Sequence, residues 1–116
     1  MREVTLVGPR GVVLHAAVPR TRRERARGLL GRAPLQPDEA VWFPRTRSIH
    51  TFGMPFPIAV AHLGPDLEVL GLLAVPPGRL VLPRRGARHV LECAVEADVR
   101  VGDRLRVDRP TRRANV

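Results

Sequence analysis

The sequence predicts an α+β fold that is mostly β, in which a small barrel-like or sandwich sheet of about seven strands is accompanied by one short helix. Two observations favour this fold. Short runs rich in Val and Leu, which suit the pleated surface of a strand, recur along the 116 residues. Turn signals built from Gly, Pro and Asp separate these runs at a spacing of roughly 8 to 12 residues, which is typical of sandwiches and barrels.

The N-terminal part of the chain predicts a hairpin followed by the one good helix candidate. Residues 4–7 and 12–18 are Val-rich runs on either side of the turn sequence Gly-Pro-Arg-Gly. The segment 21–32 then begins with Thr21 and Glu24 at the spacing of a capping box, in which each side chain accepts a hydrogen bond from the backbone N–H of the other. We therefore expect a short helix over this segment.

The middle of the chain, residues 48–62, has a period of two. From His50 onward every second residue is bulky and mostly apolar, whereas the alternate positions are mostly Gly, Pro or Ala. This alternation predicts an extended chain with one face buried, which places Phe52 and Phe56 in the core. Phe43, in the apolar run 40–43, is expected in the core as well. Because Pro55 and Pro57 lack backbone donors, we expect a break at these prolines and a regular strand over 58–63.

The remaining segments complete the predicted sheet. Further strands are expected over residues 40–43, 67–75, 89–95 and 99–107. Together with the hairpin and the helix they make a single globular domain over residues 1–107, since a chain of this length can form its own core. Residues 108–116 lack an apolar pattern and are expected to form a frayed tail.

The composition is strongly basic, with a formal net charge of +9 from 20 Lys and Arg residues against 11 Asp and Glu. All 20 are Arg, and Ala, Gly, Pro and Val are also abundant, a pattern typical of a GC-rich coding sequence. Proteins that bind single-stranded nucleic acids usually combine basic charge with exposed aromatic side chains. With three Phe expected in the core, one Trp and no Tyr, a nucleic-acid partner is not favoured.

Several other classes of protein are also not favoured. The chain has no apolar run long enough to cross a membrane and no signal peptide at its start, so we expect a cytoplasmic protein without a membrane partner. The single cysteine, Cys93, excludes an internal disulfide and lies in an apolar run typical of an inert core residue. Glu92 then points to the opposite face, where an arginine could pair with it. The four His lack the spacing of metal ligands, and neither a metal nor a cofactor is expected.

The best candidate site lies where a basic loop enters the middle stretch. We expect five residues to form it, because their cationic and hydroxyl groups are donors for a carboxylate or a phosphate: Arg45, Arg47, Ser48, His50 and Thr51. The alternative is that His50 only caps the sheet by hydrogen-bonding backbone carbonyls.

Four segments carry a resemblance to a known family: R-A-R-G-L-L-G-R (25–32), I-H-T-F-G-M-P-F-P-I (49–58), H-V-L-E (89–92) and V-G-D-R-L (101–105). They occur in the order found in the domain of unknown function 192 family, a widespread set of small prokaryotic proteins. The chain resembles this family over about residues 4–107. The resemblance implies a compact, mostly β, barrel-like α+β domain and brings no established activity.

The chain departs from the family pattern in three places. Ala59 stands where the family commonly has Asp, Thr46 where many relatives have Cys, and Glu96-Ala97 where a Gly is common. If the family Asp normally orients the histidine, Ala59 removes the partner of a catalytic base. A binding protein is then favoured over an enzyme.

Three functions follow as hypotheses. The first is a non-enzymatic domain that binds a small anionic ligand or an acidic partner segment at the loop 45–51. The second is a hydrolase-like enzyme with His50 as the general base. The third is an RNA-associated protein held by its arginine-rich flanks.

Overall fold

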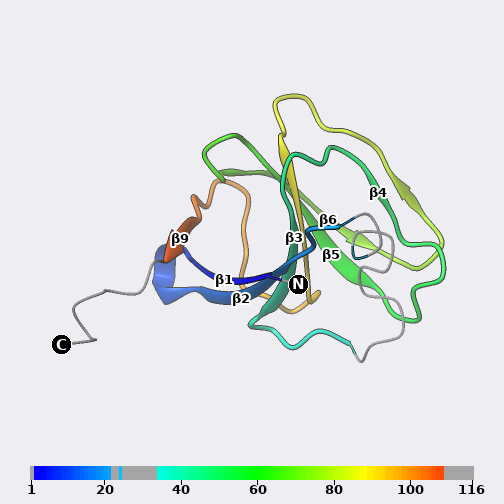
Figure 1. The fold of residues 1–116 in the computed structure, drawn as a ribbon, viewed down its shortest axis with the longest axis horizontal. Coiled ribbons are helices and arrows are strands. Elements are labelled where there is room, and N and C mark those ends of the chain that lie inside the picture. The colour runs from blue at the N-terminus through cyan, green and yellow to red at the C-terminus, as the bar shows by residue number, and fades with distance from the viewer. Residues whose placement is uncertain (1, 22–23, 25–33, 109–116) are drawn as a thin grey trace.

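A computed structural model describes residues 2–21, 24 and 34–108. Strands dominate this part of the chain (Figure 1). The elements in chain order are β1 (Arg2–Val7), the 3-10 turn η1 (Pro9–Gly11), β2 (Val13–Val18), β3 (Glu39–Phe43), β4 (Ile49–His50), β5 (Ile58–Leu63), β6 (Val69–Val75), β7 (Leu80–Val81), β8 (His89–Cys93) and β9 (Arg106–Asp108).

Seven of the strands form one mixed sheet with the order β6-β5-β8-β3-β2-β1-β9. The β2–β3 pair is parallel, and the other neighbours in this sheet are antiparallel. Strands β4 and β7 form a separate two-stranded sheet. The prediction of a mostly β domain with about seven strands in its main sheet is confirmed.

The main sheet is curled but not closed into a barrel, because its edge strands β6 and β9 do not pair with each other. The segment before β9 approaches the start of β6 instead. The Val69 N–H donates to the Asp103 carbonyl at 2.8 Å, and the Leu105 N–H donates to the Leu67 carbonyl at 3.1 Å. The barrel-like alternative is thereby corrected to an open sheet whose two ends are linked by a few hydrogen bonds.

The predicted N-terminal hairpin is confirmed. Strands β1 and β2 pair antiparallel, with Val7 opposite Val13 as the last pair before the turn. The Gly8 N–H donates to the Val12 carbonyl at 3.0 Å and closes the connection. Arg10 and Gly11 both have a positive φ, +61° and +72°. Gly11 adopts this left-handed conformation readily, whereas it is uncommon for an arginine such as Arg10.

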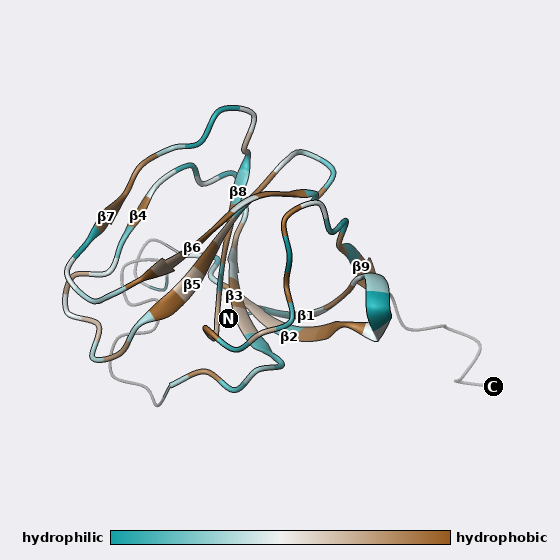
Figure 2. Cartoon of the chain, turned by 180° about the vertical axis from the view of Figure 1, so that it is seen from behind, coloured by the Kyte–Doolittle hydropathy of each residue, from teal (hydrophilic) through white to brown (hydrophobic). Residues whose placement is uncertain are grey.

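Strand β5 separates two apolar cores, and all six of its residues are buried. Ala59, Ala61 and Leu63 belong to a first core with residues of β1, β2, β6 and β8. Ile58 and Val60 belong to a second core that includes Val81 of β7. The predicted bounds of this strand are confirmed, but the expectation that only one face is buried is wrong, because the alanines of the other face also lie in a core. Figure 2 shows β5 as one of the most apolar segments.

The break predicted at the paired prolines is confirmed. No strand is present between β4, which ends at His50, and β5, which begins at Ile58. Pro55 and Pro57 lie in this connection and are exposed. Because neither can donate to a ladder, the chain pairs regularly only after the second of them.

The predicted helix lies largely outside the described residues, which omit 22–23 and 25–33. Its predicted capping box is present. The Glu24 N–H donates to the Thr21 hydroxyl at 3.1 Å, and the Glu24 carboxylate accepts from the N–H groups of Arg20 at 2.7 Å and Thr21 at 3.4 Å. The bond from the Arg20 N–H is the main reason that the pKa of Glu24 is lowered. Most of the predicted tail, 109–116, also lies outside the described residues.

None of the described segments is a helix of the length and hydropathy needed to cross a bilayer.

Candidate functional site

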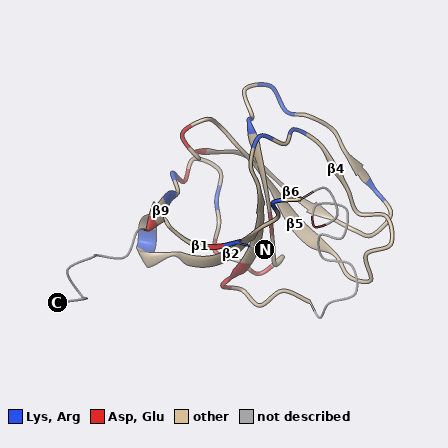
Figure 3. Ribbon diagram, viewed as in Figure 1, with Lys and Arg blue, Asp and Glu red and all other residues tan. Residues whose placement is uncertain are grey.

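The structure divides the five predicted site residues between different places. Arg45 and Arg47 line an open concavity of about 570 Å³, together with Arg88, His89 and Pro65. Ser48 is exposed, His50 is exposed on β4, and Thr51 is fully buried; none of these three lines the concavity. Figure 3 shows arginine positions of the loop after β3 and of the loop before β8 at the same end of the molecule. We call this feature the arginine concavity.

Pairing between β3 and β8 builds the arginine concavity. Phe43, the last residue of β3, lies opposite Val90, the second residue of β8, so the chain leaving β3 runs beside the chain entering β8. The Arg45 N–H donates to His89 Nδ1 at 3.1 Å across this junction. Arg45 has a positive φ of +51°, a conformation that L-residues rarely adopt and that fixes the local course of the loop. The Arg88 N–H donates to the Leu63 carbonyl at 2.7 Å, which anchors the second loop on β5.

The arginine concavity is rich in hydrogen-bond donors. The side chains of Arg45, Arg47 and Arg88 form no ion pair with any residue that the structure describes. The acidic groups of the nearby turn are occupied elsewhere, since Arg104 contacts Asp66 at 3.1 Å and Glu68 at 3.2 Å. Guanidinium groups have no acceptor, so three of them around one hollow favour an anion.

His89 adds a neutral donor to this charge. Burial lowers the pKa of His89, and the positive charges of Arg45 and Arg88 lower it further. Because Nδ1 accepts the hydrogen bond from the Arg45 N–H, the neutral ring carries its proton on Nε2. The Trp42 and His89 rings pack edge to face, with centroids 5.9 Å apart and an interplanar angle of 68°, and this contact holds the imidazole in place.

Thr51 has a structural role in place of the predicted ligand contact. Its hydroxyl donates to the Pro76 carbonyl at 2.8 Å and accepts from the Arg79 N–H at 2.9 Å. Its backbone N–H donates to the Arg79 carbonyl at 2.8 Å, and its carbonyl accepts from the Gly78 N–H at 2.9 Å. The turn 76–79 thus closes around Thr51, whose hydroxyl at 0% exposure is out of reach of a ligand.

Replacing Thr51 by Val should destabilise the fold by about 2 kcal/mol, because the isosteric side chain leaves the Pro76 carbonyl and the Arg79 N–H without their partner. Thr51→Ser keeps the hydroxyl and should cost about 1 kcal/mol for the lost methyl group. Urea unfolding of both variants measures the difference. Equal losses of stability in the two variants would show that the hydrogen bonds of the hydroxyl contribute no more than the methyl group does.

His50 lies outside the arginine concavity and stacks on Phe52. The two ring centroids are 4.8 Å apart with an interplanar angle of 19°, and His50 Nδ1 accepts from the Phe52 N–H at 3.3 Å. Phe52 is 53% exposed, so the expectation that all three Phe lie in the core is wrong. The chain turns immediately afterwards at Gly53, which has a φ of +80°, and this turn ends the alternation on which that expectation rested.

The two remaining chemical candidates, on β8, are both buried. Cys93 is at 0% exposure, which confirms the core interpretation, and burial is the first cause that raises the pKa of its thiol to about 12. Glu92 is 3% exposed, and its Oε1 has no hydrogen-bond partner among the residues that the structure describes. No arginine of the described residues pairs with Glu92, and burial raises the pKa of this carboxyl to about 7. The described residues hold no group of three metal-ligating side chains.

Sequence reasoning missed Arg88 and His89 as partners of Arg45 and Arg47. They are far from the loop 45–51 along the chain, and only the β3–β8 pairing brings them together. The sequence predicts both strands, 40–43 and 89–95, whose ends carry these residues. Nothing local in the sequence specifies that the two strands are neighbours in the sheet.

A seven-stranded open sheet with a separate β4–β7 pair and a basic hollow at one end defines a small β-rich domain, and comparison with known families identifies its class. The model of the domain of unknown function 192 family (DUF192), described as an uncharacterized ACR, matches residues 5–107. The chain therefore belongs to this family, as its motifs predicted.

Two solved structures share the fold. A protein of unknown function from Novosphingobium aromaticivorans is 24% identical, with a TM-score of 0.71 over 90% of this chain and 83% of the other. A protein from Sinorhizobium meliloti, described as a candidate transcription regulator, is 21% identical, with a TM-score of 0.74 over 90% of this chain and 92% of the other. At this level of identity the likeness concerns the fold alone. A comparison with curated proteins finds no match.

Proposed function

We propose that this protein is a non-enzymatic domain that binds a small, multiply charged anion, such as a phosphate ester or a polycarboxylate, in the arginine concavity. The observation that carries this proposal is the placement of Arg45, Arg47 and Arg88 around one hollow without an ion-pair partner in the described part of the chain. Like charges gathered at one place repel one another, and a bound anion relieves that repulsion. The cytoplasmic location expected from the sequence stays a prediction.

The volume and the donor set both suit a small ligand. About 570 Å³ lies within the range of small-molecule sites. Arginine binds carboxylate and phosphate oxygens in a bidentate manner, and the neutral His89 can add a donor without adding a charge. The anchoring of both loops, by the Arg45–His89 and Arg88–Leu63 hydrogen bonds, reduces the cost of ordering the site on binding.

Calorimetric titration with pyrophosphate tests the proposal. Arg47→Gln and Arg88→Gln should each weaken binding about tenfold, because each removes one charge-assisted contact. Arg106→Gln on β9 is the matched control, since it removes the same charge from an exposed position outside the arginine concavity and should leave the affinity within about twofold. Absence of binding to the unmodified protein would refute the proposal.

The hydrolase alternative lacks support from the surroundings of His50. A general base needs an acid or a hydroxyl within hydrogen-bond reach to orient it. In the described part of the chain the His50 ring accepts a hydrogen bond from the Phe52 N–H and stacks on the Phe52 ring. This arrangement orients the ring but supplies no group to share a proton.

RNA is the second candidate partner, because one observation favours it. The exposed stack of His50 on Phe52 is a platform of the kind on which unpaired bases stack. RNA binding would be driven by the diffuse charge of the arginine flanks, so Arg106→Gln would weaken binding as much as Arg47→Gln. If Arg106→Gln also weakened pyrophosphate binding as much as Arg47→Gln does, the proposal of an anion site confined to the arginine concavity would be overturned.

A further inference from the structure

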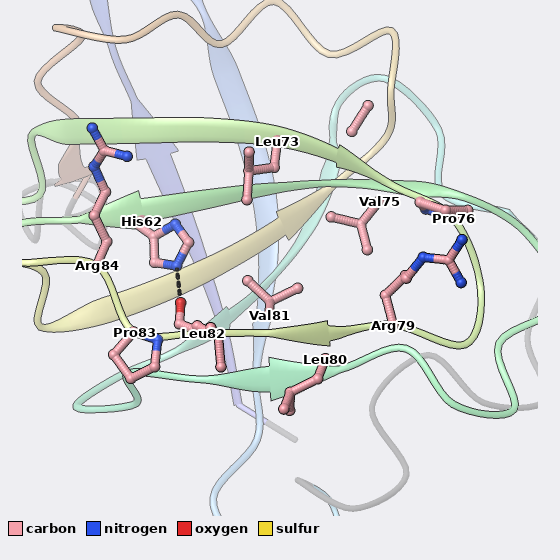
Figure 4. A pocket seen from close by; sticks show the side chains of 11 residues that line it. His62, Leu73, Val75, Pro76, Arg79, Leu80, Val81, Leu82, Pro83 and Arg84 are labelled. Atoms are coloured by element: carbon pink, nitrogen blue, oxygen red, sulfur yellow. Dashed lines mark hydrogen bonds between the residues drawn. The ribbon is translucent and has the colours of Figure 1, made fainter.

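A groove between the face of β5–β6 and strand β7 is separate from the arginine concavity. It has a volume of about 470 Å³, within the range of small-molecule sites. Figure 4 shows His62 and Val75 on one side of the groove and Val81 on the other, with Arg79 and Arg84 toward its two ends. We infer that this groove binds an elongated amphipathic monocarboxylate, with its carboxylate at Arg84 and its apolar chain along β6.

The walls of the groove are apolar and open to water. Seven large apolar side chains are exposed in the described part of the chain, and three of them, Leu73, Leu80 and Leu82, line this groove. Their exposed fractions are 48%, 61% and 67%. Such a concentration of exposed apolar surface marks a binding site more often than scattered single residues do. Val75 and Val81, both buried, continue the apolar surface into the groove.

The Arg84 end is preorganised for an anionic head group. The Arg84 side chain lies directly on Gly71, where a Cβ atom would come within 2.8 Å of both Cδ and Nε. Gly71 therefore creates the space that holds this guanidinium against β6. His62 is the residue of β5 that pairs with Gly71, so the imidazole and the guanidinium belong to the same end of the groove. Arg84 forms no ion pair with any described residue, and its charge is available to a carboxylate.

The opposite wall is fixed in place. His62 Nε2 lies 3.1 Å from the Leu82 carbonyl, to which it donates, and this bond ties the chain after β7 to β5. At the other end the hydrogen bonds of Thr51 to Pro76 and Arg79 hold the turn between β6 and β7. Both walls of the groove are thus supported before a ligand arrives.

The charge and the shape together select the ligand. Of the two arginines that line the groove, Arg84 is the one packed against β6 on Gly71, so the single carboxylate is assigned to this end and an unbranched apolar chain to the trough beyond it. From Gly71 to Val75 the strand rises about 13 Å, which suits a medium-chain carboxylate lying along β6. Short, highly charged anions of the kind proposed for the arginine concavity would leave the exposed leucines uncovered.

Calorimetric titration with hexanoate, octanoate and decanoate below their micelle concentrations tests the inference. Binding should tighten about fourfold for each added CH₂ group, which is the fold-change expected for burying it. Arg84→Gln should weaken decanoate binding about tenfold through loss of the head-group contact, and Leu73→Asn should weaken it to a similar degree through loss of apolar contact. Because Leu73 is half exposed, the second variant should fold.

Arg85→Gln is the matched control, since Arg85 is the exposed neighbour of Arg84 and does not line the groove. It should leave decanoate affinity unchanged. An affinity independent of chain length, or equal weakening by Arg84→Gln and Arg85→Gln, would overturn the inference. Because the pyrophosphate and decanoate titrations use different variants, each proposal can fail without the other.

Discussion

Glu92→Gln should abolish a loss of stability that the unmodified protein shows between pH 5 and pH 8. Glu92 is 3% exposed, its Oε1 has no partner in the described part of the chain, and burial raises its pKa from 4.5 to about 7. The folded state therefore binds more protons than the unfolded state between these two values. Its stability is fully present below about pH 4.5 and is lost as the pH rises through about 7, a change of about 2 to 3 kcal/mol.

Urea unfolding at pH 5 and pH 8 measures this change. The free energy of unfolding of the unmodified protein should fall by about 2 to 3 kcal/mol more than that of Glu92→Gln, which cannot ionise. Glu96→Gln, an exposed carboxyl on the same segment, should keep the pH dependence of the unmodified protein. If Glu92→Gln and Glu96→Gln behave alike, Glu92 is ionised in the folded protein and the account of its burial is wrong.

Arg10→Met should destabilise the fold several times more than Arg100→Met does. Arg10 Nη1 and Nη2 donate to the two carboxylate oxygens of Asp103 at 2.9 and 2.8 Å, and Asp103 is only 7% exposed. Removing the guanidinium leaves a nearly buried carboxylate with the Arg100 N–H as its remaining partner in the described part of the chain. Met keeps the Cβ atom at a residue with positive φ, so backbone strain is unchanged by the substitution.

Arg100→Met provides the comparison, because the Arg100 side chain contacts the exposed Asp98 at 3.2 Å. Its loss should cost less than about 0.5 kcal/mol. The hydrogen bond from Arg10 is the main reason that the pKa of Asp103 is lowered. The stability gained from this pair is therefore present above pH 3.8 and lost as the pH falls through the folded pKa, so the effect of Arg10→Met should shrink in acid. Equal effects of the two variants in urea unfolding at pH 7 would contradict this assignment.

The local features of the fold could be predicted from sequence because local chemistry specifies them. The prolines at 55 and 57 prevent pairing, so β5 begins where the second of them ends, and Thr21 with Glu24 forms its capping box within four residues. The open form of the sheet could not be predicted. It depends on contacts between the start of β6 and the segment before β9, which only the assembled fold brings together.

The candidate site could be predicted only in part, for the same reason. Arg45 and Arg47 were identified by their loop, whereas Arg88 and His89 join them through pairing of strands distant in the chain. Thr51 was misassigned as a ligand contact because the turn 76–79, which buries it, carries no sequence signal for that partner.

A crystal structure of the protein soaked with tungstate, a strongly scattering mimic of phosphate, tests the central proposal most directly. We predict an anomalous peak within hydrogen-bond distance of the Arg45, Arg47 and Arg88 guanidinium groups, on the hollow beside His89. A peak bound only elsewhere on the basic surface, with the arginine concavity free of tungstate, would contradict it.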